Sequence, residues 1–359
     1  MRILCLVSDT VRDCASQQRE SLLSGLVSQG HQVQEVTTTP AVRIQSYPST
    51  CLGASFCQLF TCYRLWRFLR SWQPDVIHVW NPPGFLLTQL LQVARPDCGL
   101  VITALTPPPQ EKPRFLAPWC RWLVPTENLA KEWQEWGVPA DQIREVPPLP
   151  VQESGALSRA DLFTACKLPH TARLILCLGP LTPISGYIAA LWAADILHYL
   201  FPDLVLLLAG QGPDQARLQE FAHGIHADRF TCFLGDRFAP AELVPHCDLV
   251  WETTRQAQVT DAVLLAQQFG KPLLSTWHSC LTPLVHPESV TWLPLHDPPQ
   301  WARHTAELLR NPAQGRIMGQ SGARSFQERL ASNNSLARHV KQYERLLAKP
   351  DQSWSPQAA

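Results

Sequence analysis

A continuous apolar strand that breaks directly into a glycine turn constrains the fold of this chain more than any other feature. Residues 204–213 are Leu-Val-Leu-Leu-Leu-Ala-Gly-Gln-Gly-Pro. An unbroken apolar run of this kind is typical of a strand buried on both faces of a parallel sheet, and Gly210-Gln211-Gly212-Pro213 predicts a tight turn after it. Because open parallel sheets bind ligands at the carboxyl ends of their strands, we expect this turn to face a ligand.

A second strand and a helix precede this turn in the chain. Residues 174–178 form another apolar run, which ends in the loop Gly179-Pro180-Leu181-Thr182-Pro183-Ile184-Ser185-Gly186. The apolar periodicity of Tyr187 to Tyr199 then predicts a helix. Strand, glycine-bearing loop, helix and strand in this order indicate one Rossmann-like unit of an α/β fold.

The first half of the chain alternates strands and helices in the same way. We predict strands over residues 2–7, 32–37, 76–80, 100–105 and 122–124, and helices over 17–29, 56–72, 85–93 and 128–136, with a Pro/Ser/Thr-rich loop through Thr50. Such alternation predicts a parallel sheet with right-handed crossovers.

The length of the chain indicates more than one domain. Its 359 residues, 45% of them hydrophobic and 17% charged, fit two globular domains of about 150 to 180 residues each. A proline-dense stretch, Val146 to Pro150, marks the end of the first domain. We therefore predict an N-terminal Rossmann-like domain over 1–150, a linker over 151–168, a C-terminal Rossmann-like domain over 169–332, a helix over 333–349 and a disordered tail over 350–359.

The order of these segments resembles glycosyltransferase family 4, the retaining transferases with the GT-B fold. The resemblance covers nearly the whole chain and rests, besides the two strands and loops above, on Gly30-His31-Gln32-Val33, Pro74-Asp75-Val76-Ile77-His78-Val79, Phe233-Leu234-Gly235, Cys247-Asp248-Leu249-Val250 and Gly270-Lys271-Pro272-Leu273-Leu274. It implies two Rossmann-like domains that face a cleft, with the C-terminal helix crossing back to the first domain. It also implies metal-independent transfer of a sugar from a nucleotide-sugar donor to a glycan, lipid or small acceptor, as in polysaccharide biosynthesis.

The resemblance implies a donor site on the C-terminal domain. The expected nucleotide-sugar-binding residues are Gly179, Ser185, Gly186, Gly210, Gly212 and Pro213. Backbone N–H groups and a helix dipole would stabilise the phosphates there. The alternative interpretation is that these glycines only form tight turns.

Several charged residues of the family pattern are missing from this chain. Pro180 and Ser185 replace an arginine and a lysine that contact the phosphates in the family, and Ala257 and Leu265 replace two glutamates that hold the donor. The loss of two charge-assisted hydrogen bonds, at about 1.5 to 3 kcal/mol each, predicts weak diphosphate binding. The catalytic residues are therefore unknown from the sequence.

Two nearby acids are candidates for relocated carboxylates. Asp261 lies one helical turn before Leu265, and Glu252 lies on the preceding segment. The alternative interpretation of each is a solvated or helix-capping acid.

The N-terminal half departs from the family pattern as well. Residues 8–13 replace a glycine-rich acceptor loop, Leu105 replaces a histidine, and Pro148-Leu149 replaces Asn-Gly. His78 remains, either as a buried core histidine or as a catalytic group. The sequence is compatible with two functions, an active transferase and a catalytically degenerate binding or scaffold subunit. The missing Gly-x-Gly-x-x-Gly after the first strand argues against a third, an NAD-dependent oxidoreductase.

The remaining expectations concern metals, nucleic acids and membranes. Cys51, Cys57 and Cys62 lack the spacing of a zinc site, so we expect neither a metal nor a cofactor beyond the nucleotide-sugar co-substrate. The net charge of zero argues against nucleic-acid binding. No apolar run approaches the roughly 18 residues of a membrane helix, which predicts a cytoplasmic protein. The aromatic and arginine-rich helix over 56–72 suits either packing on the sheet or peripheral contact with the inner face of a membrane.

Overall fold

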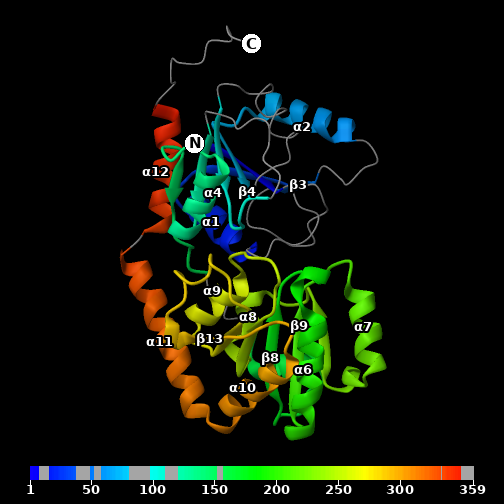
Figure 1. Ribbon diagram of the computed structural model, residues 1–359. Helices are drawn as coiled ribbons and strands as arrows, with labels where there is room; N and C mark the ends of the chain where they lie inside the picture. The colour runs from blue at the N-terminus through cyan, green and yellow to red at the C-terminus, as the bar shows by residue number, and fades with distance from the viewer. Residues whose placement is uncertain are drawn as a thin grey trace. The chain divides into compact units, whose positions relative to one another are not determined.

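The chain divides into two compact units, each built on its own sheet (Figure 1). The computed structural model describes residues 1–7, 16–37, 49–51, 58–80, 98–109, 120–151, 157–332 and 334–348. The first unit comprises Met1–Thr10, Leu22–Pro147 and Asn334–Ala359, and the second comprises Val11–Ser21 and Pro148–Asn333. The loop over 8–13, the predicted helix over 85–93, Cys57 and the predicted tail lie outside the described residues.

The first unit contains a seven-stranded sheet in which every neighbouring pair of strands is parallel. Its order is β3-β2-β1-β4-β5-β6-β7, with β1 (Arg2–Val7), β2 (Gln32–Thr37), β3 (Ser49–Cys51), β4 (Val76–Trp80), β5 (Gly99–Thr103), β6 (Cys120–Val124) and β7 (Ile143–Glu145). The predicted parallel sheet is confirmed. The short edge strands β3 and β7 were not predicted, and β3 lies where a loop was expected.

The described helices of this unit are α1 (Ser16–Ser28), α2 (Gln58–Trp72), α4 (Glu127–Trp136) and α12 (Ser335–Ala348), and the first turn and a half of α1 belongs to the second unit. Local capping explains the limits of α4. The Thr126 side chain accepts a hydrogen bond from Leu129 N at its start, and Gly137, with a φ of 123°, ends it.

Helix α2 buries an apolar face. Leu65 and Leu69 are 3% and 0% exposed. Arg70 lies over the Trp66 ring at 4.5 Å, an arrangement in which the arginine stem covers apolar surface and its charge stays in water. This half of α2 therefore fits the packing interpretation of the helix.

Polar contacts attach α12 to the sheet of the first unit. His78, on β4, is fully buried and both of its ring nitrogens have partners: Nδ1 lies 2.8 Å from the Tyr343 hydroxyl on α12, and Nε2 lies 2.7 Å from the Thr103 hydroxyl. Burial, with a further contribution from His339, holds the pKa of His78 well below its ordinary value. His78 is a satisfied core histidine in this structure.

The second unit contains a six-stranded sheet whose neighbouring strands are also all parallel. Its order is β10-β9-β8-β11-β12-β13, with β8 (Arg173–Leu178), β9 (Leu204–Ala209), β10 (Thr231–Gly235), β11 (Leu249–Glu252), β12 (Leu273–Ser275) and β13 (Val290–Trp292). The chain runs outward from β8 to one edge and then returns to β11 on its other side. The switch point, where doubly wound sheets bind ligands, therefore lies between β8 and β11.

Besides the start of α1, the α-helices described in the second unit are α5 (Arg159–Ala165), α6 (Tyr187–Leu200), α7 (Gln215–Gly224), α8 (Pro240–Leu243), α9 (Asp261–Gln268), α10 (Pro298–Arg310) and α11 (Pro312–Ser332). Helix α5 forms within the segment predicted as a linker. The core includes Trp251 and Trp301, whose rings meet edge to face at 5.6 Å, and Trp251 Nε1 donates to the Thr305 hydroxyl at 3.1 Å.

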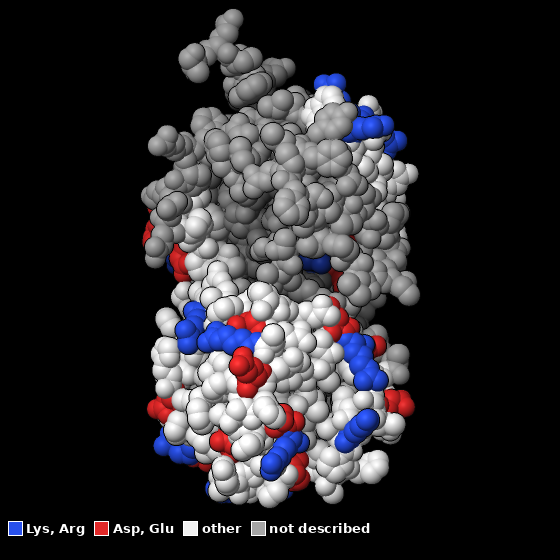
Figure 2. Space-filling view, turned by 90° about the vertical axis from the view of Figure 1, so that its right-hand side faces the viewer, with Lys and Arg blue, Asp and Glu red and all other residues white. Residues whose placement is uncertain are grey.

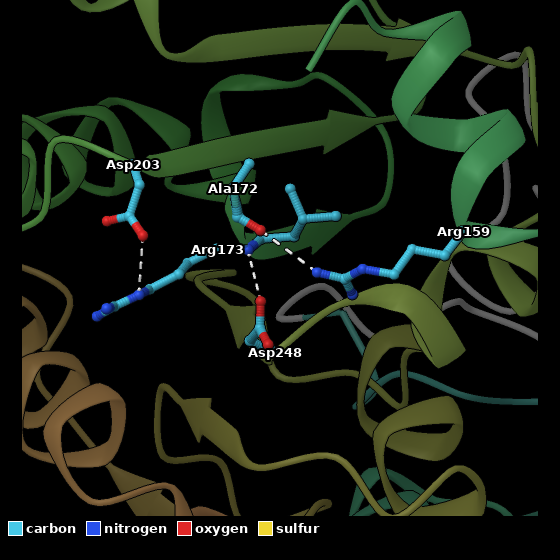
Figure 3. Close-up of polar contacts among 6 residues, drawn as sticks. Arg159, Ala172, Arg173, Asp203 and Asp248 are labelled. Atoms are coloured by element: carbon cyan, nitrogen blue, oxygen red, sulfur yellow. Dashed lines mark hydrogen bonds and ion pairs between the residues drawn. The ribbon is translucent and has the colours of Figure 1, made fainter. Parts of the chain in front are cut away.

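Polar contacts join the segments at the amino-terminal edge of this sheet (Figure 3). The Asp248 carboxylate accepts from Leu174 N at 2.8 Å and so ties the start of β11 to β8. Arg173 pairs with Asp203 at 3.1 Å, and Arg159 donates to Ala172 O at 3.3 Å. These charged side chains are committed to holding the sheet, and none of these contacts lies at the opposite, carboxyl edge.

Charged groups of both signs are interspersed on the described part of the second unit that Figure 2 presents. None of the described helices is long and apolar enough to cross a membrane. Within the same described ranges, no group of three or more His, Cys, Asp or Glu side chains is arranged to hold a metal ion.

Candidate functional site

The candidate site lies at the carboxyl edge of the second unit's sheet, around the switch point between β8 and β11. The loop Gly179–Gly186 follows β8, the turn Gly210–Pro213 follows β9, and the segment over 253–260 follows β11. All of the predicted donor-binding residues lie on the first two of these segments.

Glycines allow these segments to pack backbone against backbone. Gly210 has a φ of +138°, and a Cβ atom there would lie 2.0 Å from Gly179 O. A Cβ on Gly212 would lie 2.2 Å from Leu181 O, and one on Gly186, whose φ is +75°, would lie 2.1 Å from Thr253 O. Side chains at these positions would therefore separate the three segments. The glycines have a clear structural role, and their contact with a donor stays a prediction.

Hydrogen bonds between the segments use several of the loop N–H groups. Gly179 N donates to Ala209 O at 3.0 Å, Leu181 N to Gln211 O at 3.0 Å, and Gly210 N to Gly235 O at 2.9 Å. Those groups point into the protein. Helix α6 begins at Tyr187, directly after Gly186, so the positive end of its dipole lies at this loop and remains suited to an anion.

Ser185 is part of the loop's internal structure. It is 6% exposed, and its hydroxyl donates to Pro180 O at 2.5 Å. A second hydroxyl, that of Thr182, lies 2.9 Å away. The hydrogen of the Ser185 hydroxyl is thus committed within the loop.

Glu252 is a buried carboxyl at the end of β11. It is 4% exposed, and its two oxygens accept from the Thr260 hydroxyl at 2.5 Å and from Thr254 N at 3.0 Å. Burial raises the pKa of Glu252 to about 7, against the opposing effect of these hydrogen bonds. A carboxyl with such a pKa can hold or release a proton near neutral pH, as general acids and bases do.

Asp261 has a different environment at the first position of α9. It is 5% exposed, and its carboxylate accepts from Gln17 N at 3.1 Å, at the start of α1 in the segment that belongs to the second unit. A carboxylate at the N-terminus of a helix is a capping group. This geometry fits the capping interpretation of Asp261.

The positions of the family's two glutamates offer no replacement. Leu265 is fully buried on α9, and Ala257 is partly exposed in the segment after β11. Neither side chain can accept a hydrogen bond.

His278, after β12, is a polar group of this edge that the sequence analysis missed. Its Nε2 lies 3.0 Å from Thr254 O and 3.2 Å from the Thr276 hydroxyl. Because a carbonyl oxygen only accepts, Nε2 carries the hydrogen and Nδ1 is left as an acceptor. Burial lowers the pKa of His278, which favours the neutral ring. The only signal in the sequence was a polar stretch directly after a predicted strand.

Comparison with known proteins supports the family resemblance. Residues 20–149 match the sequence model of the family described as Glycosyltransferase Family 4. The predicted resemblance to this family is confirmed over those residues. In a comparison with curated proteins, no sequence matches.

Solved structures share the fold over nearly the whole chain. Sucrose-phosphate synthase from Thermosynechococcus elongatus aligns with a TM-score of 0.74 and 16% identity over 97% of this chain and 100% of its own. WaaG, a glycosyltransferase involved in lipopolysaccharide biosynthesis, aligns with a TM-score of 0.73 and 14% identity over 97% and 100%. HepE from Anabaena, in complex with UDP-glucose, aligns with a TM-score of 0.72 and 13% identity over 95% and 100%. The predicted GT-B fold, with two Rossmann-like units, is confirmed.

Proposed function

We propose that this protein is a glycosyltransferase that binds a nucleotide sugar at the carboxyl edge of the second unit. It transfers the sugar, with retention of configuration and without a metal, to a glycan, a lipid or a small acceptor. The observation that carries this proposal is the glycine-packed loop after β8, which lies beside Glu252 at the switch point of the sheet. HepE, which shares the fold, is solved with UDP-glucose.

In this proposal the donor lies against the segments after β8 and β9 and the N-terminus of α6. Its contacts are with Gly179, Ser185, Gly186, Gly210, Gly212 and Pro213. The helix dipole of α6 stabilises the diphosphate. The N–H groups of Gly179 and Gly210 donate to carbonyl groups within the protein. In the proposal these two glycines therefore let the donor approach the backbone closely, and they do not donate hydrogen bonds to it.

Glu252 is the carboxyl that we propose for the chemistry, ahead of Asp261. It lies at the switch point, and its pKa of about 7 suits proton exchange with a sugar hydroxyl or a leaving phosphate near neutral pH. Asp261 is the second candidate, although its carboxylate caps α1.

A second function is favoured by a specific observation. Leu265 is fully buried where the family has a donor-binding glutamate, and both candidate acids already hold structural hydrogen bonds. This favours a nucleotide-sugar-binding or scaffold subunit of polysaccharide biosynthesis that does not turn over. Both functions belong to the cytoplasm, with peripheral membrane contact if the acceptor is lipid-linked.

Two measurements on the full chain distinguish these functions. Calorimetry with a panel of UDP- and GDP-sugars tests donor binding, and a radiolabelled-donor assay tests release or transfer of the sugar. Binding with turnover that Glu252→Gln abolishes supports the transferase. Binding without turnover supports the binding subunit, and the absence of binding across the panel contradicts both.

A further inference from the structure

The loop after β8 carries no charged side chain of its own. Its residues, Gly179 to Gly186, are all neutral. A nucleotide diphosphate presents several anionic oxygens, and charge-assisted hydrogen bonds are the strongest way to bind them. The Ser185 hydroxyl is buried and donates to Pro180 O, so it offers the diphosphate neither a charge nor a free hydrogen. A cation for the diphosphate must therefore come from a neighbouring segment.

The segment Thr253 to Arg255, at the end of β11, lies directly against this loop. The Thr253 hydroxyl donates to Ser185 O at 2.7 Å, and Arg255 N donates to Ile184 O at 2.7 Å. On its other side the segment is anchored by the bond from Thr254 N to the Glu252 carboxylate. The backbone of Arg255 is thus fixed beside the position where the family has its lysine.

The side chain of Arg255 is exposed to solvent. Its guanidinium has no hydrogen bond, ion pair or ring contact with any residue in the described part of the chain. Other arginines of the unit are engaged: Arg159 with Ala172 O, Arg173 with Asp203, and Arg237 with Ala165 O. A guanidinium presents five donors in a planar fork that matches two phosphate oxygens at once.

We propose that Arg255 binds the diphosphate of the nucleotide-sugar donor, in place of the arginine and lysine that the family has at the positions of Pro180 and Ser185. The inference rests on the proposed donor site and adds a residue to it. The cation reaches the phosphates from the segment after β11, and the loop after β8 contributes the close backbone surface and the α6 dipole.

Calorimetric titration of the full chain with UDP and with uridine tests this assignment. The variants are Arg255→Gln, which removes the charge, and Arg255→Lys, which keeps the charge and loses the fork. The matched control is Arg316→Gln. Arg316 is an exposed arginine near the start of α11. It lies far from the candidate site, because α10, about 20 Å long, separates it along the chain from the carboxyl edge of the sheet.

We expect Arg255→Gln to weaken UDP binding by about tenfold to a hundredfold. Arg255→Lys should recover part of this loss. Arg316→Gln should bind UDP as the wild type does, and uridine affinity should be the same in all four proteins. Because Arg255 is exposed, the variants should unfold at the wild-type temperature, and Arg255→Lys provides the test if Arg255→Gln does not fold.

The outcomes separate this inference from the proposed function. If the wild type binds UDP and Arg255→Gln binds it equally well, Arg255 is not the phosphate ligand, although the donor site stands. If Arg316→Gln weakens UDP binding as much as Arg255→Gln does, the effect is one of general charge and the inference fails. If the wild type binds no UDP, GDP or nucleotide sugar, both the inference and the proposed donor site fail.

Discussion

Replacing Glu252 with glutamine is expected to stabilise the protein, and to do so much more at pH 8 than at pH 5. Burial raises the pKa of Glu252 from 4.5 to about 7. Between these values the folded protein binds more protons at this site than the unfolded chain does, so the carboxyl lowers the free energy of unfolding as the pH rises through this window. At about 1.4 kcal/mol per pKa unit, the full effect above pH 7 is about 3 kcal/mol.

Glutamine removes the charge while it keeps the local hydrogen bonding. Its amide oxygen can accept from Thr254 N, and its amide NH2 can donate to the Thr260 hydroxyl. We would measure the free energy of unfolding by chemical denaturation of the wild type and Glu252→Gln at both pH values. The variant should exceed the wild type by less than about 1 kcal/mol at pH 5 and by about 2 to 3 kcal/mol at pH 8.

The matched control is Glu328→Gln, at an exposed position of α11. Because this side chain is exposed, its replacement should change the free energy of unfolding by less than about 0.5 kcal/mol. Two results would refute the claim that the buried Glu252 carboxylate destabilises the folded protein. One is equal stabilisation by Glu252→Gln at pH 5 and pH 8, and the other is a variant less stable than the wild type at pH 8.

Three further predictions concern packing inside the individual units. Gly210→Ala should destabilise the protein by more than about 2 kcal/mol in denaturant unfolding, because its Cβ would clash with Gly179 O, whereas Gly224→Ala, with open space around it, should be neutral or stabilising. Burial lowers the pKa of His339 to about 4, so the free energy of unfolding should fall as the pH drops below 6.5, by about 2 kcal/mol at pH 5. His339→Gln should abolish this pH-dependent loss in unfolding curves measured at pH 7 and pH 5. Tyr343→Phe, which removes the hydroxyl partner of His78, should cost about 1 to 3 kcal/mol in the same assay, and an unchanged midpoint would contradict the role of this contact.

The apolar runs of the sequence predicted most of the fold. Strands β8 and β9 were recognisable because fully buried parallel strands are apolar throughout and end at glycines. Strands β3 and β7 have three residues each and lie at the edges of their sheet, so neither shows a periodicity. Short edge strands depend on the neighbour with which they pair, and one sequence segment does not reveal that neighbour.

The sequence predicted where a donor site would lie, but not how the segments around that candidate site pack. The glycines after β8 and β9 were evident because the turns need them, but their close approach to Leu181 O and Thr253 O depends on the three-dimensional packing. The role of Asp261 depends on Gln17, which is 244 residues away. A lone arginine or histidine in a loop has no pattern, so Arg255 and His278 became apparent only through the carbonyl groups that fix them.

Hydrogen exchange of the full chain with and without UDP-glucose tests the central claim most directly. If the carboxyl edge of the second unit holds the donor, added protection should concentrate in Gly179–Gly186, in Gly210–Pro213 and in the segment after β11, because a bound ligand stabilises the folded state where it binds. The amino-terminal edge around Asp203 and Asp248 should exchange at an unchanged rate. Ligand-dependent protection confined to that edge or to the first unit, or none at saturating UDP-glucose, GDP-sugar or UDP, would contradict the account.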